Sequence, residues 1–270
     1  HLSIRRQRQM CIRDSHKGER NTNDFKDIIM YGSGSSGNSL YIKPYKIIID
    51  LGLAYRNYDE DIFYNVKYIL LTHEHGDHFY VTTIDRIHKK FPHITFVMSE
   101  HLYDVAFDIF KKKGRDFNDI KNIQILSKNE PLIYEIENDE YALIKHTMTD
   151  HGDIPNVSYT IKGFKPIDSI KEPVILYASD LISTEPTTRT EGLPKDEIYN
   201  LMFLEANYDA ADVHEVLKHD PHDRKALGNL RHLSEDNAFN YVYRYLNKEH
   251  GYFIPLHASN EFGSFIQIRK

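Results

Sequence analysis

Short apolar runs that end in polar residues recur along the chain and predict buried strands. Each run is shorter than an ordinary helix and rich in β-branched or aromatic residues, which favours a strand. These runs occupy residues 27–31, 68–71, 94–98, 173–178, 201–204 and 252–256. Alternating patterns predict four further strands, over residues 123–126, 132–136, 141–144 and 159–161. The chain is therefore expected to be rich in sheet.

Helical spacing of apolar residues appears in three segments between these strands. Residues 81–90 place Ile84 and Ile87 on one side, and Pro92 marks the stop. Ser99 is a suitable N-cap for a second helix, which runs to about residue 113. A third helix is expected over residues 235–246.

A glycine-rich segment, Gly32-Ser33-Gly34-Ser35-Ser36-Gly37, matches the G-x-G-x-x-G pattern of dinucleotide-binding proteins. That pattern works when a crossover helix follows the glycines and leads to a parallel strand. Only residues 38–45 separate the segment from the next apolar run, and Pro44 interrupts them. We therefore interpret the segment as a turn between antiparallel strands.

Composition sets broad limits on the chain. Its 270 residues are 40% apolar, enough for a substantial core in one large domain or two small ones. The formal net charge of −6 gives no overall basic field of the kind that indicates nucleic-acid binding, although it does not exclude such binding. Residues 1–24 are polar, basic and without periodicity. We expect them to be a disordered N-terminal extension, with a nucleic-acid-binding arm as the alternative, and residues 25–270 to form a single domain.

Cysteine and hydropathy patterns indicate the compartment. Cys11 is the only cysteine, which excludes an internal disulfide and any cysteine-based zinc cluster. No run approaches the roughly 18 apolar residues of a membrane span, and the basic N-terminus lacks the apolar segment of a signal peptide. We expect a soluble, cytoplasmic protein that does not bind membranes.

The segment Thr72-His73-Glu74-His75-Gly76-Asp77-His78, here called the histidine loop, directly follows an apolar run. Its imidazoles and carboxylates suit Zn²⁺ or a similar divalent ion. The helical metalloprotease pattern fails, because the fourth residue after His73 is Asp77 and Gly76 disfavours a helix. We expect an extended loop in which His73 and His75 share one side, while a turn at Gly76 directs Asp77 and His78 to a neighbouring position. One loop could then serve two metal ions.

This loop resembles the signature of the metallo-β-lactamase fold superfamily. The segment Ser33-Gly34-Ser35-Ser36-Gly37-Asn38-Ser39 also resembles the opening of the YycJ-like nucleases in that superfamily. The resemblance implies a four-layer αββα sandwich with its metal site at strand ends between two mixed sheets. Asp50, which ends the apolar run that follows the glycine-rich segment, is expected either to support the histidine loop or to be structural only.

The same resemblance implies a set of metal ligands. One ion would take His73, His75 and His151, with His151 preferred over His146, and the other would take Asp77, His78 and His257. Asp180, at the end of a predicted strand, would bridge the two ions. The ions are expected to be zinc, with manganese as the alternative, and to activate a shared water for hydrolysis.

Two residues outside this set indicate which bond is broken. Glu205 and His232-Leu233-Ser234 resemble the acid–histidine pair of phosphodiesterases of the RNase Z, YycJ and PhnP kind. An imidazole can protonate an alkoxide leaving group. The expected catalytic residues are therefore Asp77, Glu205 and His232, and the expected substrate is DNA, RNA or another phosphodiester. A glyoxalase-II-type thioesterase or lactonase, and a metal-binding scaffold without turnover, are the alternatives.

The chain departs from the YycJ pattern next to two of these residues. Asn229-Leu230-Arg231 precedes His232 where a glycine is common, and His257-Ala258-Ser259-Asn260 also differs. The basic cluster at residues 111–115 is expected to complement the end of a helix, with contact to a phosphate backbone as the alternative. No metal role is expected for His88, His93 or His101.

Overall fold

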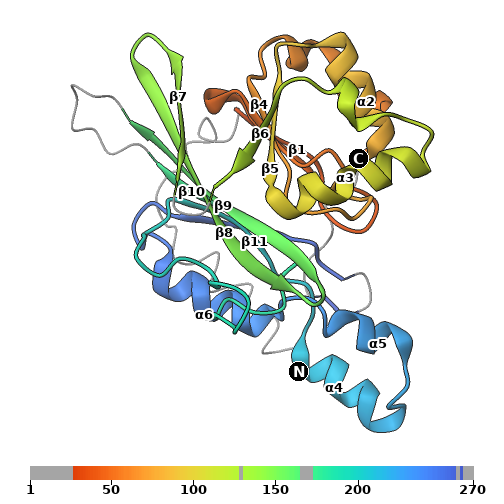
Figure 1. Ribbon diagram of the computed structural model, residues 1–270. Helices are drawn as coiled ribbons and strands as arrows, with labels where there is room; N and C mark the ends of the chain where they lie inside the picture. The colour runs from red at the N-terminus through yellow and green to blue at the C-terminus, as the bar shows by residue number, and fades with distance from the viewer. Residues whose placement is uncertain (1–26, 128–129, 165–172, 260–261, 264–270) are drawn as a thin grey trace.

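The computed structural model describes residues 27–127, 130–164, 173–259 and 262–263 (Figure 1). The extension expected at residues 1–24 lies outside these ranges, as does Asn260. Among the described residues, no helix has the length and apolar character needed to cross a lipid bilayer.

The first sheet is mixed and has the strand order β1-β2-β3-β4-β5-β6. β1 pairs antiparallel with β2, and β2 with β3, whereas β3 to β6 are parallel. The strands span Ile28–Gly32, Ser39–Ile42, Ile47–Ile49, Tyr68–Leu70, Thr95–Ser99 and Ile123–Leu126. Each predicted strand in this part of the chain is present.

The second sheet has the order β12-β11-β10-β9-β8-β7. β10, β11 and β12 are parallel, and the remaining pairs are antiparallel. From β7 to β12 the strands span Leu132–Glu137, Glu140–His151, Ile154–Phe164, Val174–Ala178, Leu201–Glu205 and Tyr252–Leu256.

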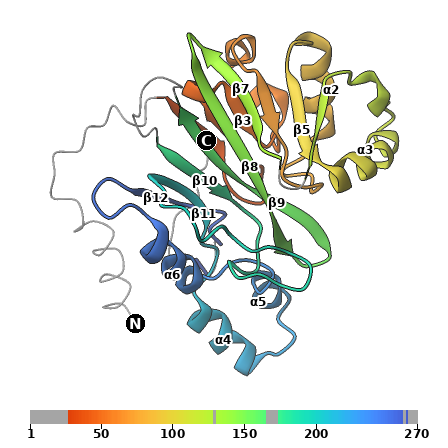
Figure 2. The ribbon, with the colours of Figure 1, turned by 60° about the vertical axis from the view of Figure 1, so that its left-hand side comes forward.

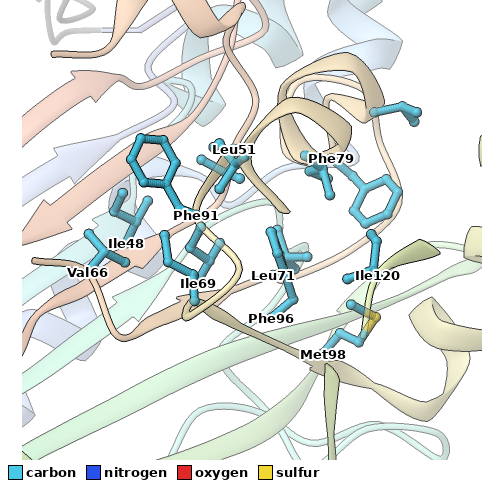
Figure 3. Packing of buried hydrophobic residues seen from close by; sticks show 14 of the residues in the cluster. Ile48, Leu51, Val66, Ile69, Leu71, Phe79, Phe91, Phe96, Met98 and Ile120 are labelled. Carbon is cyan, nitrogen blue, oxygen red and sulfur yellow. The ribbon is translucent and has the colours of Figure 1, made fainter. Parts of the chain in front are cut away.

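Three apolar clusters divide the molecule into four layers. One lies between the first sheet and the helices α2 (Val81–Lys90) and α3 (Glu100–Lys112), and Figure 3 shows its packing around Ile69 and Phe96. The second fills the space between the sheets, and the third lies between the second sheet and α6 (Glu235–Tyr245). Figure 1 shows α2 and α3 on one side and α6 on the other. The four-layer αββα prediction is confirmed.

The glycine-rich segment is the β1–β2 turn, as predicted. Gly34 and Gly37 have φ angles of 137° and 138°, which side-chain-bearing residues rarely adopt. A Cβ on Gly37 would lie 2.5 Å from the Leu53 side chain and 2.7 Å from the Gly52 carbonyl oxygen. The glycines therefore serve the turn.

Two parts of the fold differ from the sequence-based expectation. The segment between Ile144 and Tyr159, expected to be a connection, extends β8 and β9 into one long hairpin (Figure 2). Two helices were not anticipated, α4 (Ala210–His219) and α5 (Arg224–Asn229), which share a small cluster formed by Tyr208, Val213 and Ala226. Asp209 and Asp223 cap them through hydrogen bonds to backbone amides.

Candidate metal centre

The predicted site residues follow the ends of strands that lie side by side. Asp50 follows β3, and the histidine loop follows β4 in the first sheet. Asp180, Glu205 and His257 stand at the ends of the parallel strands β10, β11 and β12 in the second. Because the carboxyl ends of parallel strands meet at one edge, their side chains gather there.

Left-handed backbone marks three of these strand ends. Asp50, Asp180 and His257 have φ angles of 60°, 53° and 52°. Such values are uncommon for residues with a side chain and persist where the surrounding structure fixes them. Asn156 contributes at Asp180, because its Nδ2 donates to the carbonyl oxygens of Ser179 and Asp180, both at 2.7 Å.

The first metal group joins His73, His75 and His151. Nδ1 of His75 lies 3.1 Å from Nε2 of His73 and 3.3 Å from Nε2 of His151. His151 is the last residue of β8, so the long hairpin brings it to the histidine loop. His146, the alternative considered from sequence, is absent from the groups of described residues that could hold a metal ion.

The second group joins Asp77, His78 and His257, whose ligand atoms lie within 4.8 Å of one another. Asp180 reaches this group through both of its oxygens. Its Oδ2 lies 2.5 Å from Nε2 of His78, and its Oδ1 lies 3.5 Å from Nε2 of His257. Asp180 also forms a potential metal group with His73 and His78, so it stands between the two groups.

Hydrogen bonds fix which nitrogen each buried imidazole presents. His78 donates from Nδ1 to Oδ2 of Asp50 at 2.7 Å, so Nε2 is the nitrogen that faces Asp180 and the second metal group. The Thr72 hydroxyl donates to the Asp50 carboxylate and lies 3.0 Å from Nδ1 of His73, so Nε2 of His73 is the nitrogen that faces the first metal group. Asp50 is fully buried and also accepts a hydrogen bond from Tyr177. It therefore supports the histidine loop.

The β1–β2 turn reaches the site, which the sequence did not indicate. Asn38 is buried, and its Nδ2 lies 2.7 Å from Nε2 of His78 and 3.4 Å from Oδ2 of Asp77. Ser33 accepts a hydrogen bond from the backbone N–H of His257 at 2.9 Å. The glycine-rich turn thus contacts all three residues of the second metal group.

The histidine loop is more tightly turned than predicted. The backbone N–H groups of His78 and Phe79 both donate to the carbonyl oxygen of His75, so the loop coils here instead of remaining extended. A Cβ on Gly76 would meet open space, but a Cβ on Gly52 would lie 1.6 Å from the Asp77 carbonyl oxygen. The essential glycine is Gly52, which the sequence-based interpretation did not single out.

Charge differs between the two groups. Burial lowers the pKa of His73 well below its usual value, and it also lowers the pKa of His151. Burial alone would lower the pKa of His257 as well, but the Asp180 carboxylate and the Asp77 hydrogen bond raise it to about 9. Burial would raise the pKa of Asp180, whereas the His257 and His78 imidazoles hold it well below its usual range. Asp180 is thus ionised.

These features match the requirements of divalent metal ions. In the first group the nitrogens of three imidazoles converge, with contacts of 3.1 and 3.3 Å, and a cation between them could be bound by all three. The second group adds the carboxylates that balance a second cation. The donor set therefore fits two divalent ions, and nitrogen-rich sites of this kind suit zinc.

A buried glutamate, Glu205, and a half-buried histidine, His232, form an acid–histidine pair next to Asp180. With Asp180 and His257 the pair makes a further group of described residues that could hold a metal ion. Oε1 of Glu205 lies 2.7 Å from Nδ1 of His232, and Oε2 of Glu205 accepts a hydrogen bond from the Leu181 N–H at 2.7 Å. Nδ1 of His232 lies 3.4 Å from Oδ1 of Asp180. The imidazole rings of His232 and His257 stack, with centroids 4.8 Å apart. The pair predicted from sequence is therefore assembled next to the predicted bridging residue.

The remaining histidines singled out from sequence have other contacts. His93 meets the Phe63 carbonyl oxygen at 3.1 Å, and His88 meets Asp85 at 3.5 Å. His101 lies 2.8 Å from Glu74, inside the histidine loop. None of the three belongs to a potential metal group among the described residues.

Neither a protein-family model nor a curated protein sequence matches the chain. Among solved structures, it is similar to the metallo-β-lactamase fold protein YhfI from Bacillus subtilis, with 16% identity, a TM-score of 0.53 and 86% of each chain covered. A diphosphatase from the PhnP family has 14% identity, a TM-score of 0.47 and 87% of each chain covered.

A Cronobacter sakazakii metallo-β-lactamase with a HARLDQ motif, described as mutant S60, has 14% identity and a TM-score of 0.46, with 81% of this chain and 88% of that chain covered. The first similarity agrees with the two mixed sheets and their outer helices. The chain has the metallo-β-lactamase fold.

Proposed function

We propose that this protein is a phosphodiesterase that depends on two divalent metal ions and acts on nucleic acid. The observation that carries the proposal is the Glu205–His232 pair, with its 2.7 Å contact, beside Asp180. The fold favours metal-dependent hydrolysis in general. The Glu205–His232 pair favours a substrate whose leaving group must be protonated.

Seven residues would hold the ions. His73, His75 and His151 would bind one, Asp77, His78 and His257 would bind the other, and Asp180 would bridge them. When bound, such ions lower the pKa of a water to about 7 and polarise a phosphoryl oxygen. Asp77 would also orient the attacking water through its carboxylate, whose side chain is 25% exposed.

His232 would act as the general acid. Burial alone would lower its pKa, but the Glu205 charge and hydrogen bond raise it above the usual value, so the imidazole keeps its proton near neutral pH. Because Nδ1 donates to Glu205, Nε2 is the nitrogen that can protonate the leaving oxygen. A thiolate leaving group needs no such donor, which favours a phosphodiester over a thioester.

Hydrolysis assays on the metal-supplemented protein test this proposal. Bis(p-nitrophenyl) phosphate and end-labelled DNA and RNA should be hydrolysed, whereas a thioester and a lactone should be poor substrates. If the thioester or lactone is hydrolysed and the phosphodiesters are not, the protein is a glyoxalase-II-type enzyme instead. Tight metal binding without turnover of any substrate would support a metal-binding scaffold.

A further inference from the structure

A row of exposed polar residues follows one side of helix α2. Thr82, Arg86 and Lys90 are spaced by four residues, so they lie on the same face, and all three are exposed. At about 1.5 Å of rise per residue the row is roughly 12 Å long. Since α2 begins three residues after His78, the row starts next to the histidine loop and leads away from it.

The charge on this side of α2 is positive. A hollow of about 510 Å³ is lined by Thr82, Asp85, Arg86, Lys89, Lys90 and Arg115. Its only acid, Asp85, is buried and binds both Arg115 and Lys89. Glu60, which is not among the lining residues, forms an ion pair with Lys90. Cations therefore outnumber acids on this surface, on a chain whose net charge is −6.

The end of helix α3 continues the positive surface. Lys111, Lys112 and Lys113 are exposed, and within the described part of the chain no ion pair involves them. Arg115, two residues further on, forms the ion pair with Asp85 that joins this segment to α2. We call Arg86, Lys89, Lys90, Lys111, Lys112, Lys113 and Arg115 together the α2 basic face.

Aromatic rings accompany these cations. The guanidinium of Arg86 lies 4.1 Å from the centroid of the Tyr55 ring. Tyr80, at the start of α2, is 41% exposed, and Tyr64, packed edge-on against Phe91, is 63% exposed. A cationic surface with accessible aromatic rings is the combination that binds single-stranded nucleic acid, because cations contact phosphates and rings stack on bases.

Both helices also begin at the metal centre. α2 follows the histidine loop directly, and His101 in the first turn of α3 contacts Glu74 of that loop. The cations are concentrated at the opposite ends of the two helices, near Lys90 and Lys113. A small phosphodiester bound at the metals cannot span this separation, but a polynucleotide can.

We propose that the α2 basic face binds the phosphate backbone of a single-stranded polynucleotide and leads it to the metal centre. This inference rests on the proposed phosphodiesterase function, assigns the surface that binds the nucleic acid, and specifies a single-stranded polynucleotide as the substrate. It also gives a role to the basic cluster at residues 111–115 beyond complementing the end of α3.

The test compares two triple variants with the same loss of charge. One carries Arg86→Gln, Lys90→Gln and Lys113→Gln. The control carries Lys43→Gln, Lys145→Gln and Lys248→Gln, exposed positions away from α2. Fluorescence anisotropy with a fluorescein-labelled single-stranded oligonucleotide gives Kd as a function of salt, and hydrolysis of bis(p-nitrophenyl) phosphate reports on the metal centre.

The first variant should bind the oligonucleotide roughly 10-fold to 100-fold more weakly, and its log Kd against log salt slope should fall by about 2, since each lost phosphate contact removes about 0.7. Its hydrolysis of bis(p-nitrophenyl) phosphate should match that of the wild type. The control should behave like the wild type in both assays.

Equal losses in the two variants, or a wild type that does not bind the oligonucleotide, would overturn the inference even if the small phosphodiester is hydrolysed. Salt-dependent oligonucleotide binding that is lost only in the α2 variant, in a protein that hydrolyses neither substrate, would support the inference and contradict the proposed function.

Discussion

The side-chain amide nitrogen of Asn38 lies 2.7 Å from Nε2 of His78, the nitrogen that faces the second metal group. Its amide oxygen accepts the Gly34 N–H at 2.7 Å, which fixes the orientation of the amide. The backbone N–H of Asn38 donates to the Asp77 carbonyl oxygen at 2.7 Å. One residue of the β1–β2 turn therefore holds both neighbouring ligands of the second metal group.

Asn38→Ala should release that group. The loss of buried hydrogen bonds should cost about 1–3 kcal/mol of stability, and the second metal should be removed more easily by a chelator. Elemental analysis after stepwise chelator dialysis measures the effect. Asn200→Ala is the control, because Asn200 accepts a hydrogen bond from the Val174 N–H at the other end of β10. If Asn38→Ala keeps both ions as firmly as the control, Asn38 has no part in positioning the metal.

Gly52 and Gly76 form a matched pair for testing the histidine loop. A Cβ on Gly52 would lie 1.6 Å from the Asp77 carbonyl oxygen, while a Cβ on Gly76 would meet nothing within 4 Å. Gly52→Ala should therefore displace the loop and lower both the melting temperature and the metal content. Gly76→Ala should leave both unchanged. Calorimetry measures the melting temperature, and elemental analysis measures the metal content. If only Gly76→Ala lowered these two quantities, the assignment of Gly52 as the glycine that the loop requires would be wrong.

Local patterns predicted most of the strands and the polar residues at their ends, whereas the four-layer sandwich and the set of metal ligands were implied by the resemblance to a known superfamily. The apolar runs at residues 173–178, 201–204 and 252–256 predicted the strands β10, β11 and β12. Asp180, Glu205 and His257 lie at the ends of these strands. The grouping of these ends came from the resemblance to a known fold, because spacing along the chain does not determine which strands are neighbours.

Other features depend on contacts between distant residues, which the sequence pattern does not contain. Asn38 meets His78, and Gly52 meets Asp77, only after β1 to β4 have paired. The continuation of β8 to His151 depends on its pairing with β9, since residues 145–150 are polar enough to suggest a loop. α5 is a short helix without clear apolar spacing, so its capping residue Asp223 was the available signal.

His75→Ala and Asp180→Ala test the ligand assignment. His75 belongs to the first metal group, and Asp180 stands between the two groups. Each substitution should reduce bound metal as well as phosphodiesterase activity, and Asp180→Ala should affect both ions. Elemental analysis of the purified variants provides the count. Two full equivalents retained by Asp180→Ala would remove that residue from the bridging role.

The buried Asp85 carboxylate should give a pH-dependent contribution to stability. Burial alone would raise its pKa, but the Lys89 hydrogen bond and the Arg115 charge lower it below the usual value. A group with a lowered folded-state pKa stabilises the fold above its unfolded pKa, and the contribution is lost as pH falls through the folded pKa. Asp85→Asn should lower the free energy of unfolding at neutral pH, and the difference from wild type should shrink below about pH 3.9. Urea titrations across this range would contradict the account if the difference were constant.

Glu205→Gln should act through His232. Glu205 is fully buried and holds Nδ1 of His232 at 2.7 Å, so the substitution weakens both the orientation and the charge of the imidazole. Turnover should fall less than in His232→Ala, and the double variant should lose little more than His232→Ala alone, because the two residues act as a unit. Fully additive losses in the three variants would show that they act independently.

The central claim is that His232 protonates the leaving group. The most direct test is whether the loss of turnover in His232→Ala depends on the leaving group. Turnover should fall by roughly 10²–10⁴ on phosphodiesters with poor alkoxide leaving groups, the usual contribution of a positioned proton donor. With p-nitrophenolate, which needs little protonation, the loss should be much smaller, and metal content should match that of the wild type. Equal losses on both classes of substrate, with unchanged metal, would contradict the assignment of His232 as the general acid.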